Sequence, residues 1–268
     1  MRNAGRPGFL VLDPVSGVMG LDAFAEDENI QLMTVRRGVY QTLSRLWMEE
    51  VDQTFWEALK VTAFPSLPES PRLDQAFHQL EGYLAANQPG VLTQLAADYA
   101  ILCRGASPVK GADPYESVHR NPLGLMMQDE WEDVLRFYRK AGYHLLPTAV
   151  EPEDHLGIEL DFMACLCDRY IRTVQLKDKE TSQESLMMQS KMLDAHLLKW
   201  VPHFVQEVLR LTATDFYQAV AVITQEYLLM DRGVLATLIP DPVAGTPDPK
   251  GPLTPGPTRP ASPGAPTS

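Results

Sequence analysis

Two glutamates, an aspartate and a histidine stand together at the start of one apolar helical pattern. Glu151, Asp154, His155 and Glu159 lie within nine residues of one another. His155 and Glu159 are four apart, so they can meet on one face of a helix. A carboxylate beside a histidine raises the pKa of the imidazole and orients its ring, as general base catalysis requires. The group therefore has a catalytic interpretation.

The same residues also have a structural interpretation in which no chemistry takes place. Asp154 would then be the N-cap residue of the helix, and His155 would be satisfied by Glu159. No nucleophile and no set of metal ligands accompanies the group in the sequence. Both interpretations stay open from the residues alone.

Sequence motifs of nucleotide, hydrolase and zinc sites are missing. Residues 105–111 contain glycines and a lysine, but in the wrong order for a phosphate-binding P-loop. No G-x-S-x-G elbow occurs, and the six histidines include no H-E-x-x-H and no pairing with cysteine at ligand spacing. The sequence therefore offers no cradle for phosphate and no zinc site.

Apolar residues recur at spacings of three and four along most of the chain, which is the period of one helix face. These stripes cover residues 32–46, 55–59, 73–84, 91–102, 131–138, 156–174, 186–197, 205–209 and 216–227. No convincing run of strand alternation accompanies them. The pattern predicts an all-α fold, with about nine helices in a single bundle-like domain over residues 29–239.

Residues 104–127 interrupt this pattern with glycines and prolines and predict a long connection. Long ordered loops inside a compact domain are often functional. Within it, Tyr115, Glu116 and Ser117 form either a proline-led turn capped by the serine or one edge of a peptide-binding groove. The sequence favours neither of the two.

Two methionine pairs could each lie either in a binding surface or in an ordinary structural position, whereas one arginine pair has a structural interpretation alone. Met126-Met127 and Met187-Met188 could line an adaptable apolar groove, because flexible thioethers suit variable peptides, although core filling is expected for at least one of each pair. Arg36-Arg37 lies inside a predicted amphipathic helix and is not followed by an apolar leader. We therefore expect these two arginines on a solvated helix face.

The two ends of the chain differ from its centre. Residues 1–28 contain glycine, proline and aspartate breaks, and their short apolar run predicts a loose leader and no signal peptide. Residues 240–268 hold ten of the 22 prolines and no aromatic residue. Such a segment cannot bury enough apolar surface to offset its ordering entropy, so we expect a disordered tail that aids solubility or recruits a partner.

Composition and charge limit the classes of partner. The net charge is −12, which disfavours nucleic acids and anionic membranes and favours basic partners. No apolar run is long enough to span a bilayer. The three cysteines, Cys103, Cys165 and Cys167, do not form a disulfide framework. We expect reduced thiols in or near the core, and hence a cytoplasmic protein.

Four short motifs in a fixed order resemble the TorD/DmsD family. They are the E-x-x-D-H signature with its apolar helix at residues 151–163, an acidic-Tyr-x-x-Leu helix end at 98–103, a P-x-x-S-V loop at 114–119, and a Leu-x-x-Trp-x-Pro-x-Phe segment at 198–204. The order and spacing match over residues 30–235. Cys103 and His119 stand where the family has aromatic residues. The contacts of those rings are therefore not carried over.

The resemblance implies an all-helical cytoplasmic chaperone, not an enzyme, with no cofactor of its own. Its implied partner is the catalytic subunit of a molybdenum-cofactor oxidoreductase, or the basic twin-arginine leader of that subunit. Cofactor insertion would be assisted and export delayed. The residues expected to bind the client are Glu151, Asp154, His155, Glu159, Tyr115, Glu116 and Ser117.

Three alternatives stay open beside this interpretation. The client could be a nitrate-reductase-type subunit that is not exported. The chain could instead be a helical nucleotide-binding or hydrolytic protein that uses Asp154 and His155. The family resemblance also allows weak binding of guanine nucleotides, although the sequence contains no phosphate-binding loop. Finally, a plain helical scaffold could recruit partners through residues 240–268.

Overall fold

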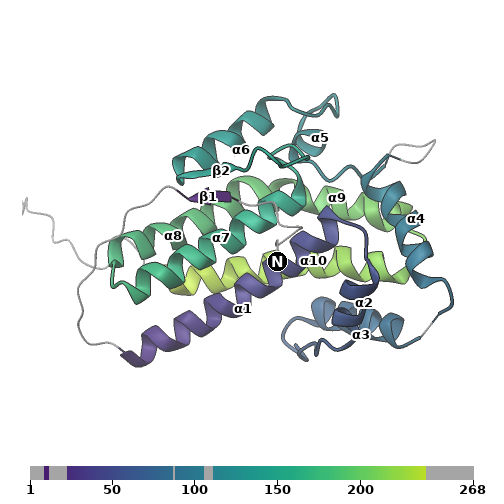
Figure 1. The fold of residues 1–268 in the computed structure, drawn as a ribbon, viewed down its shortest axis with the longest axis horizontal. Helices are drawn as coiled ribbons and strands as arrows, with labels where there is room; N and C mark the ends of the chain where they lie inside the picture. The colour runs from purple at the N-terminus through teal and green to yellow at the C-terminus, as the bar shows by residue number, and fades with distance from the viewer. Residues whose placement is uncertain (1–8, 12–22, 87, 106–110, 240–268) are drawn as a thin grey trace, which may run out of the picture.

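Helices make up nearly all of the regular structure in the computed structural model, which describes residues 9–11, 23–86, 88–105 and 111–239 (Figure 1). The helices of the N-terminal half are α1 (Ala23–Met48), α2 (Gln53–Lys60), α3 (Pro71–Ala85), α4 (Val91–Cys103) and α5 (Glu116–Arg120). They are followed by α6 (Asp129–Lys140), α7 (Leu156–Gln175), α8 (Lys179–Met192), the π-helical segment η1 (Leu193–Leu197), α9 (Leu198–Leu211) and α10 (Asp215–Leu238). The predicted all-α fold of about nine helices is confirmed, with α5 as a single short turn.

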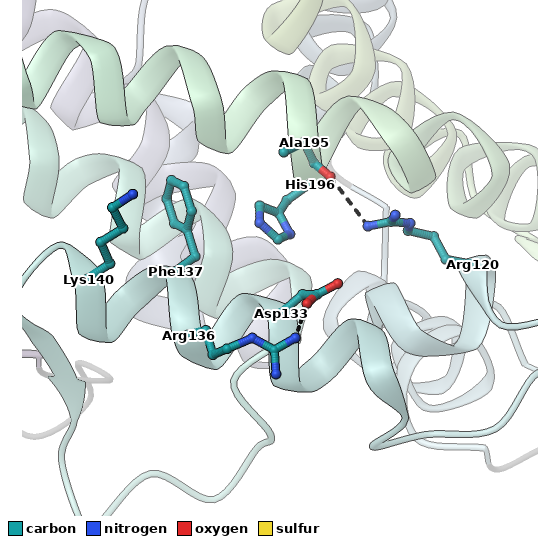
Figure 2. A pocket seen from close by; sticks show the side chains of 7 residues that line it. All are labelled: Arg120, Asp133, Arg136, Phe137, Lys140, Ala195 and His196. Carbon is teal, nitrogen blue, oxygen red and sulfur yellow. Dashed lines mark hydrogen bonds and ion pairs between the residues drawn. The ribbon is translucent and has the colours of Figure 1, made fainter.

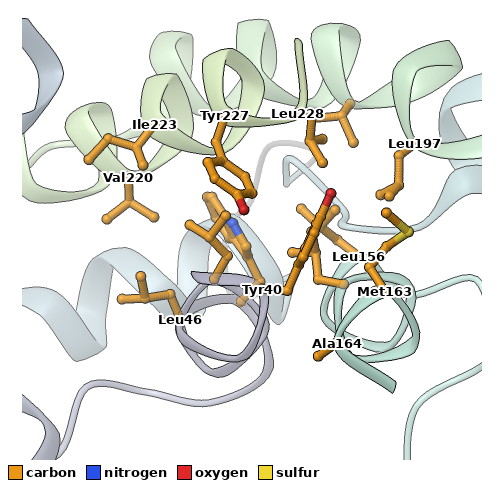
Figure 3. Close-up of a cluster of buried hydrophobic side chains, with 14 of the residues drawn as sticks. Tyr40, Leu46, Leu156, Met163, Ala164, Leu197, Val220, Ile223, Tyr227 and Leu228 are labelled. Carbon is orange, nitrogen blue, oxygen red and sulfur yellow. The ribbon is translucent and has the colours of Figure 1, made fainter. Parts of the chain in front are cut away.

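Helix α7 is the centre of the fold. It packs along α1 on one side and α8 on the other, while α10 packs against α3 and α9. Fifteen of its residues are buried, because its apolar positions face neighbours on several sides. Figure 3 shows side chains from α1, α7 and α10, among them Tyr40, Met163 and Leu228, meeting in one buried cluster. The start of α7, where the predicted site lies, is therefore held by the core.

Gly157 allows α1 and α7 to approach closely. A Cβ atom at this position would lie 2.3 Å from Cγ of Met48 and 3.1 Å from the carbonyl oxygen of Ser44. The hydroxyl of Ser44 donates a hydrogen bond of 2.6 Å to the Gly157 carbonyl oxygen. A side chain at position 157 would push the two helices apart.

Two short strands depart from the prediction. β1 (Phe9–Val11) pairs antiparallel with β2 (Tyr143–Leu145), so that Phe9 lies opposite Leu145. β1 falls in the segment predicted to be a loose leader, and α1 begins at Ala23, inside the same segment. Three-residue strands are too short to give an alternating pattern, which explains why the sequence did not indicate them. The predicted C-terminal tail lies outside the described residues.

Arg36 contradicts the expected solvated face. Its side chain is 3% exposed, and it pairs with Asp231 of α10 through Nε–Oδ1 and Nη2–Oδ2 contacts of 2.5 and 2.7 Å. Its Nη1 also donates to Gln189 at 2.6 Å, and the Tyr40 hydroxyl donates to Asp231 at 2.6 Å. These partners lie far along the chain, so the helix pattern of α1 alone could not reveal them. Arg37 is partly exposed and pairs with Asp168.

The thiols have the burial predicted for them. Cys103 and Cys167 are buried, Cys165 is partly buried, and all three are free. Burial raises the pKa of the Cys167 thiol to about 12. Over the described ranges, no helix combines the length and the apolar character that crossing a membrane requires.

Candidate functional site

A short backbone pairing joins the loop before α5 to the start of α7. Tyr115 and His155 form an isolated antiparallel bridge. The N–H of Glu116 donates to the Asp154 carbonyl at 3.0 Å, and the N–H of Leu156 donates to the Pro114 carbonyl at 2.8 Å. The structure therefore brings together the two segments that the sequence singled out separately.

Asp154 fixes Ser117 by its side chain. The Ser117 N–H donates a 2.9 Å hydrogen bond to Asp154 Oδ2, and the Ser117 hydroxyl is a further hydrogen-bond partner of this carboxylate. Oγ of Ser117 in turn accepts a 3.2 Å hydrogen bond from the N–H of Met127. Both Asp154 and Ser117 are fully buried. Burial raises the pKa of Asp154 above its usual range.

His155, and not Asp154, is the N-cap residue of α7. Its Nδ1 accepts a 3.0 Å hydrogen bond from the Gly157 N–H. The expected contact between His155 and the Glu159 side chain is wrong, because the Glu159 carboxyl group hydrogen-bonds with Trp200 and Glu116 instead. Burial lowers the pKa of His155 to about 4, so the ring is neutral at pH 7. The Tyr115 ring meets it edge-on, with centroids 5.1 Å apart.

Glu151 lies at the rim of this cluster. One carboxylate oxygen accepts a 2.7 Å hydrogen bond from the Tyr115 hydroxyl, and the other pairs with Arg104 at the end of α4. The Arg104 guanidinium also donates to the Met48 carbonyl at 3.3 Å. The hydrogen bonds from Tyr115 and Arg104 outweigh partial burial and hold the pKa of the Glu151 carboxylate below its usual range.

Glu159 belongs to a buried network behind the rim. Its Oε2 accepts a 3.1 Å hydrogen bond from Trp200 Nε1, and its carboxyl group hydrogen-bonds with Glu116. Burial, and then the nearby Glu116 charge, raise the pKa of Glu159 well above its usual range. The protonated form of Glu159 is therefore favoured in the fold, where the carboxyl group is fully buried.

Glu116 connects this network to the surface. Its carboxylate contacts Nδ1 of His196 at 3.0 Å and pairs with Arg120 one helical turn away. His196 lies on η1, and π-helical insertions are frequent at functional sites. Sequence reasoning missed His196, Arg120 and Arg104, because each reaches the cluster from another element and none forms a motif with it.

The site offers less free negative charge than the acidic residues at positions 151, 154 and 159 suggest in the sequence. The pKa of Glu159 is raised well above its usual range, Glu151 is paired with Arg104, and the pKa of His155 is lowered to about 4. Free carboxylates for a guanidinium group are thus not available at the mouth of α7. The physical reason is burial, which the helix pattern could not show for residues covered by α5 and α9.

A pocket of about 430 Å³ lies on the other side of Glu116, between α5, α6 and η1 (Figure 2). Figure 2 shows His196 facing the space between Phe137 and Arg120, with Arg136 and Lys140 along α6. Asp133 pairs with Arg136, and the Arg120 guanidinium donates to the Ala195 carbonyl at 3.3 Å. None of the seven predicted client-binding residues lines this pocket. Within the described ranges, histidine, cysteine and acidic residues form no cluster suited to a metal ion.

His119 replaces an aromatic ring in the motif and still makes ring contacts. It stacks on Trp200 with centroids 5.4 Å apart and meets Phe204 edge-on at 5.8 Å. Its Nε2 lies 2.9 Å from the carbonyl oxygens of Ala112 and Asp113. The imidazole thus fixes the loop before α5 against α9.

Comparison with known proteins identifies one family and a set of chaperones that are similar to this chain. The sequence pattern of the family described as "Nitrate reductase delta subunit" matches residues 69–206, which contain the whole cluster. The chain is 27% identical to the chaperone protein TorD of Vibrio vulnificus over 207 residues, covering 75% of this chain and 94% of that protein.

Two further relatives are also TorD chaperone proteins. The chaperone protein TorD of Vibrio cholerae is 27% identical over 218 residues, or 79% of this chain and 97% of the relative. That of Aeromonas salmonicida is 33% identical over 150 residues, covering 55% and 64%. The similarity to these chaperones therefore extends over most of the chain.

Proposed function

The chain belongs to the nitrate reductase delta subunit family, and from this membership we propose that it is a system-specific chaperone that matures a molybdenum-cofactor oxidoreductase. The observation that carries the proposal is the family match over residues 69–206. The relatives named as TorD chaperones support it over a longer part of the chain. In this role the protein is cytoplasmic, binds its client and catalyses no reaction.

The client in this proposal is the catalytic subunit, its basic twin-arginine leader, or both. Binding holds the subunit until the cofactor is inserted and delays export. The family description favours a second candidate, a nitrate-reductase-type subunit that is not exported. The two candidates differ in whether the bound subunit carries a leader.

We assign two kinds of role to the predicted residues. Glu151 is partly exposed at the rim, where a client can reach it, and it can exchange Arg104 for a basic group of the client. The other six residues are buried and support this surface; they are Tyr115, Glu116, Ser117, Asp154, His155 and Glu159. A hydrolytic or nucleotide-binding role for Asp154 and His155 has less support, because both side chains are buried and each already accepts a hydrogen bond from a backbone N–H, at Oδ2 and Nδ1 respectively.

Isolation of the tagged full chain from its own cells tests the proposal. Mass spectrometry should find the catalytic subunit of a molybdenum-cofactor oxidoreductase enriched over a tagged acidic helical protein used as control. If the captured subunit is encoded with a leader, the client is the exported subunit. If it is encoded without one, the client is the nitrate-reductase-type subunit that is not exported. Failure to enrich any such subunit would contradict the proposal.

A further inference from the structure

The loop between α5 and α6, residues 121–128, concentrates exposed apolar side chains. Leu123 is 78% exposed, Leu125 49%, Met126 42% and Met127 54%. These four belong to the eleven large apolar side chains that are exposed among the described residues. Their gathering within five positions is unusual, because exposed apolar residues normally occur singly and a contiguous patch marks an interaction site. We call residues 121–128 the apolar loop.

The apolar loop has a defined conformation that keeps these side chains outside. The Asn121 side chain accepts a 2.9 Å hydrogen bond from the Leu123 N–H, and the Asn121 carbonyl accepts one of 3.0 Å from Gly124. Met127 has φ of 56°, in the left-handed region that a bulky side chain rarely adopts. Its N–H bond to Ser117 Oγ holds it there. The loop is thus maintained at some conformational cost without burying its apolar groups.

Acidic residues follow the apolar loop directly. Asp129, Glu130 and Glu132 occupy the first turn of α6, and Asp133 comes next. Arg136 pairs with Glu132 and Asp133, which leaves exposed Asp129 and partly buried Glu130, the two nearest to the loop, as the charged flank. The surface therefore offers apolar contacts beside negative charge.

We propose that the apolar loop and its acidic flank form the docking surface for a peptide that carries basic residues beside an apolar run. Charge complementarity argues for this occupant, because the flank attracts a basic group while the loop covers the apolar run. A second copy of the chain fits less well, since each copy carries a net charge of −12 and the same acidic flank. The inference rests on the proposed function in one respect: it takes the client's leader as the source of the peptide.

Asp154 and Ser117 act in this proposal as positioning residues. Asp154 holds Ser117 by its backbone N–H, and Ser117 holds the backbone of Met127. Neither side chain is exposed, so neither contacts the peptide directly. The buried aspartate of the motif thereby acts on the exposed loop through two hydrogen bonds.

Fluorescence anisotropy with a synthetic peptide tests the docking surface on the full chain. The probe carries two adjacent arginines followed by a run of about twelve leucines and alanines, a length that covers a few helical turns. Leu123→Ser with Met126→Ser should weaken binding by about tenfold or more, because two apolar contacts are lost. Val61→Ser with Leu209→Ser, at positions 84% and 41% exposed in other parts of the fold, is the matched control and should leave affinity unchanged.

Charge and positioning are tested separately. Asp129→Asn should weaken binding more at low than at high salt, whereas Glu180→Gln, in the first turn of α8, should not. Ser117→Ala should speed hydrogen exchange at the Met127 amide and weaken the peptide at equal folded fraction. A probe that keeps its arginines but loses its apolar run should bind weakly.

Three results would overturn the proposal: wild-type chain that does not bind the probe, a loop variant that binds it as tightly as wild type, or a loop variant that changes only self-association. The last would assign the loop to a contact between copies. Failure of the proposed function is distinguishable, because the chain would then bind the probe through the loop while enriching no oxidoreductase subunit from its cells.

Discussion

The backbone N–H of Ser117 donates a hydrogen bond of 2.9 Å to Oδ2 of Asp154, and this contact ties α5 to the start of α7. The two residues are 37 positions apart in the chain and both are fully buried. This hydrogen bond and the bridge between Tyr115 and His155 join two segments that appear in the sequence as separate motifs.

Removal of the Asp154 carboxylate should therefore destabilise the fold. Asp154→Ala leaves the buried Ser117 N–H without its acceptor, which costs about 1–3 kcal/mol. Chemical denaturation at pH 7 measures the change in the free energy of unfolding. Asp129→Ala, at an exposed position in the first turn of α6, is the control and should cost less than about 1 kcal/mol. Equal losses in the two variants would show that burial at position 154 does not matter.

His155 should make the protein sensitive to acid. Its pKa is lowered from 6.5 to about 4 in the fold, so the unfolded chain binds the proton first as pH falls. The stability from this neutral ring is present above pH 6.5 and is lost as pH falls towards 4, by up to about 3 kcal/mol.

His155→Asn isolates this effect, because asparagine can still accept the hydrogen bond of Gly157 as N-cap residue but does not titrate. The free energy of unfolding is measured for both proteins between pH 7 and 4. Wild type should lose more stability than the variant over this range. Parallel curves would mean that His155 is not buried in its neutral form.

Glu159 should act in the opposite direction. Its pKa in the fold is raised well above the usual 4.5, so the folded chain holds a proton that the unfolded chain has released. The stability contributed by the protonated carboxyl is complete below pH 4.5 and decreases as pH rises towards the raised pKa. Glu159→Gln removes the titration while keeping an acceptor for Trp200 Nε1.

Unfolding measured from pH 5 to 8 should thus show wild type falling relative to Glu159→Gln. The neighbouring Glu116 is left unchanged in both proteins. A wild-type curve that rises relative to the variant over this range would show that Glu159 is ionised in the fold.

Sequence periodicity predicted the helices well, because an amphipathic helix shows its buried face at spacings of three and four. The same rule could not find β1 and β2, whose three residues each are defined only by their pairing with one another. It also placed the N-cap one residue early. Asp154 and His155 are both polar residues before the first apolar position, and the hydrogen bonds of the fold decide between them: Asp154 accepts from Ser117, whereas His155 accepts from Gly157 as the N-cap residue.

The chemistry of the site was less predictable than its location. The sequence brought Glu151, Asp154, His155 and Glu159 together, but their charge states depend on residues from other elements. Arg104 pairs with Glu151, while burial and the nearby Glu116 raise the pKa of Glu159. Contacts between residues tens of positions apart leave no periodic signal in the sequence. The acidic segment 151–159, considered alone, therefore suggests more free negative charge than the fold leaves.

The two neighbouring arginines of α1 provide a test of buried against exposed ion pairs. Arg36→Met leaves the buried Asp231 without its bidentate partner and should destabilise the fold by about 3–5 kcal/mol. Arg37→Met removes a partly exposed pair with Asp168 and should cost at most about 1 kcal/mol. Thermal and chemical denaturation of both variants check the difference. Similar costs would contradict the buried position of Arg36.

The molybdenum content of the client shows whether this protein acts as a maturation chaperone. The oxidoreductase subunit identified by isolation with the full chain is purified from cells that have or lack this protein, and molybdenum is measured per mole of subunit. The chaperone account predicts a clearly lower molybdenum content without the protein and recovery when the wild-type chain is restored. Full molybdenum loading in its absence would contradict the account.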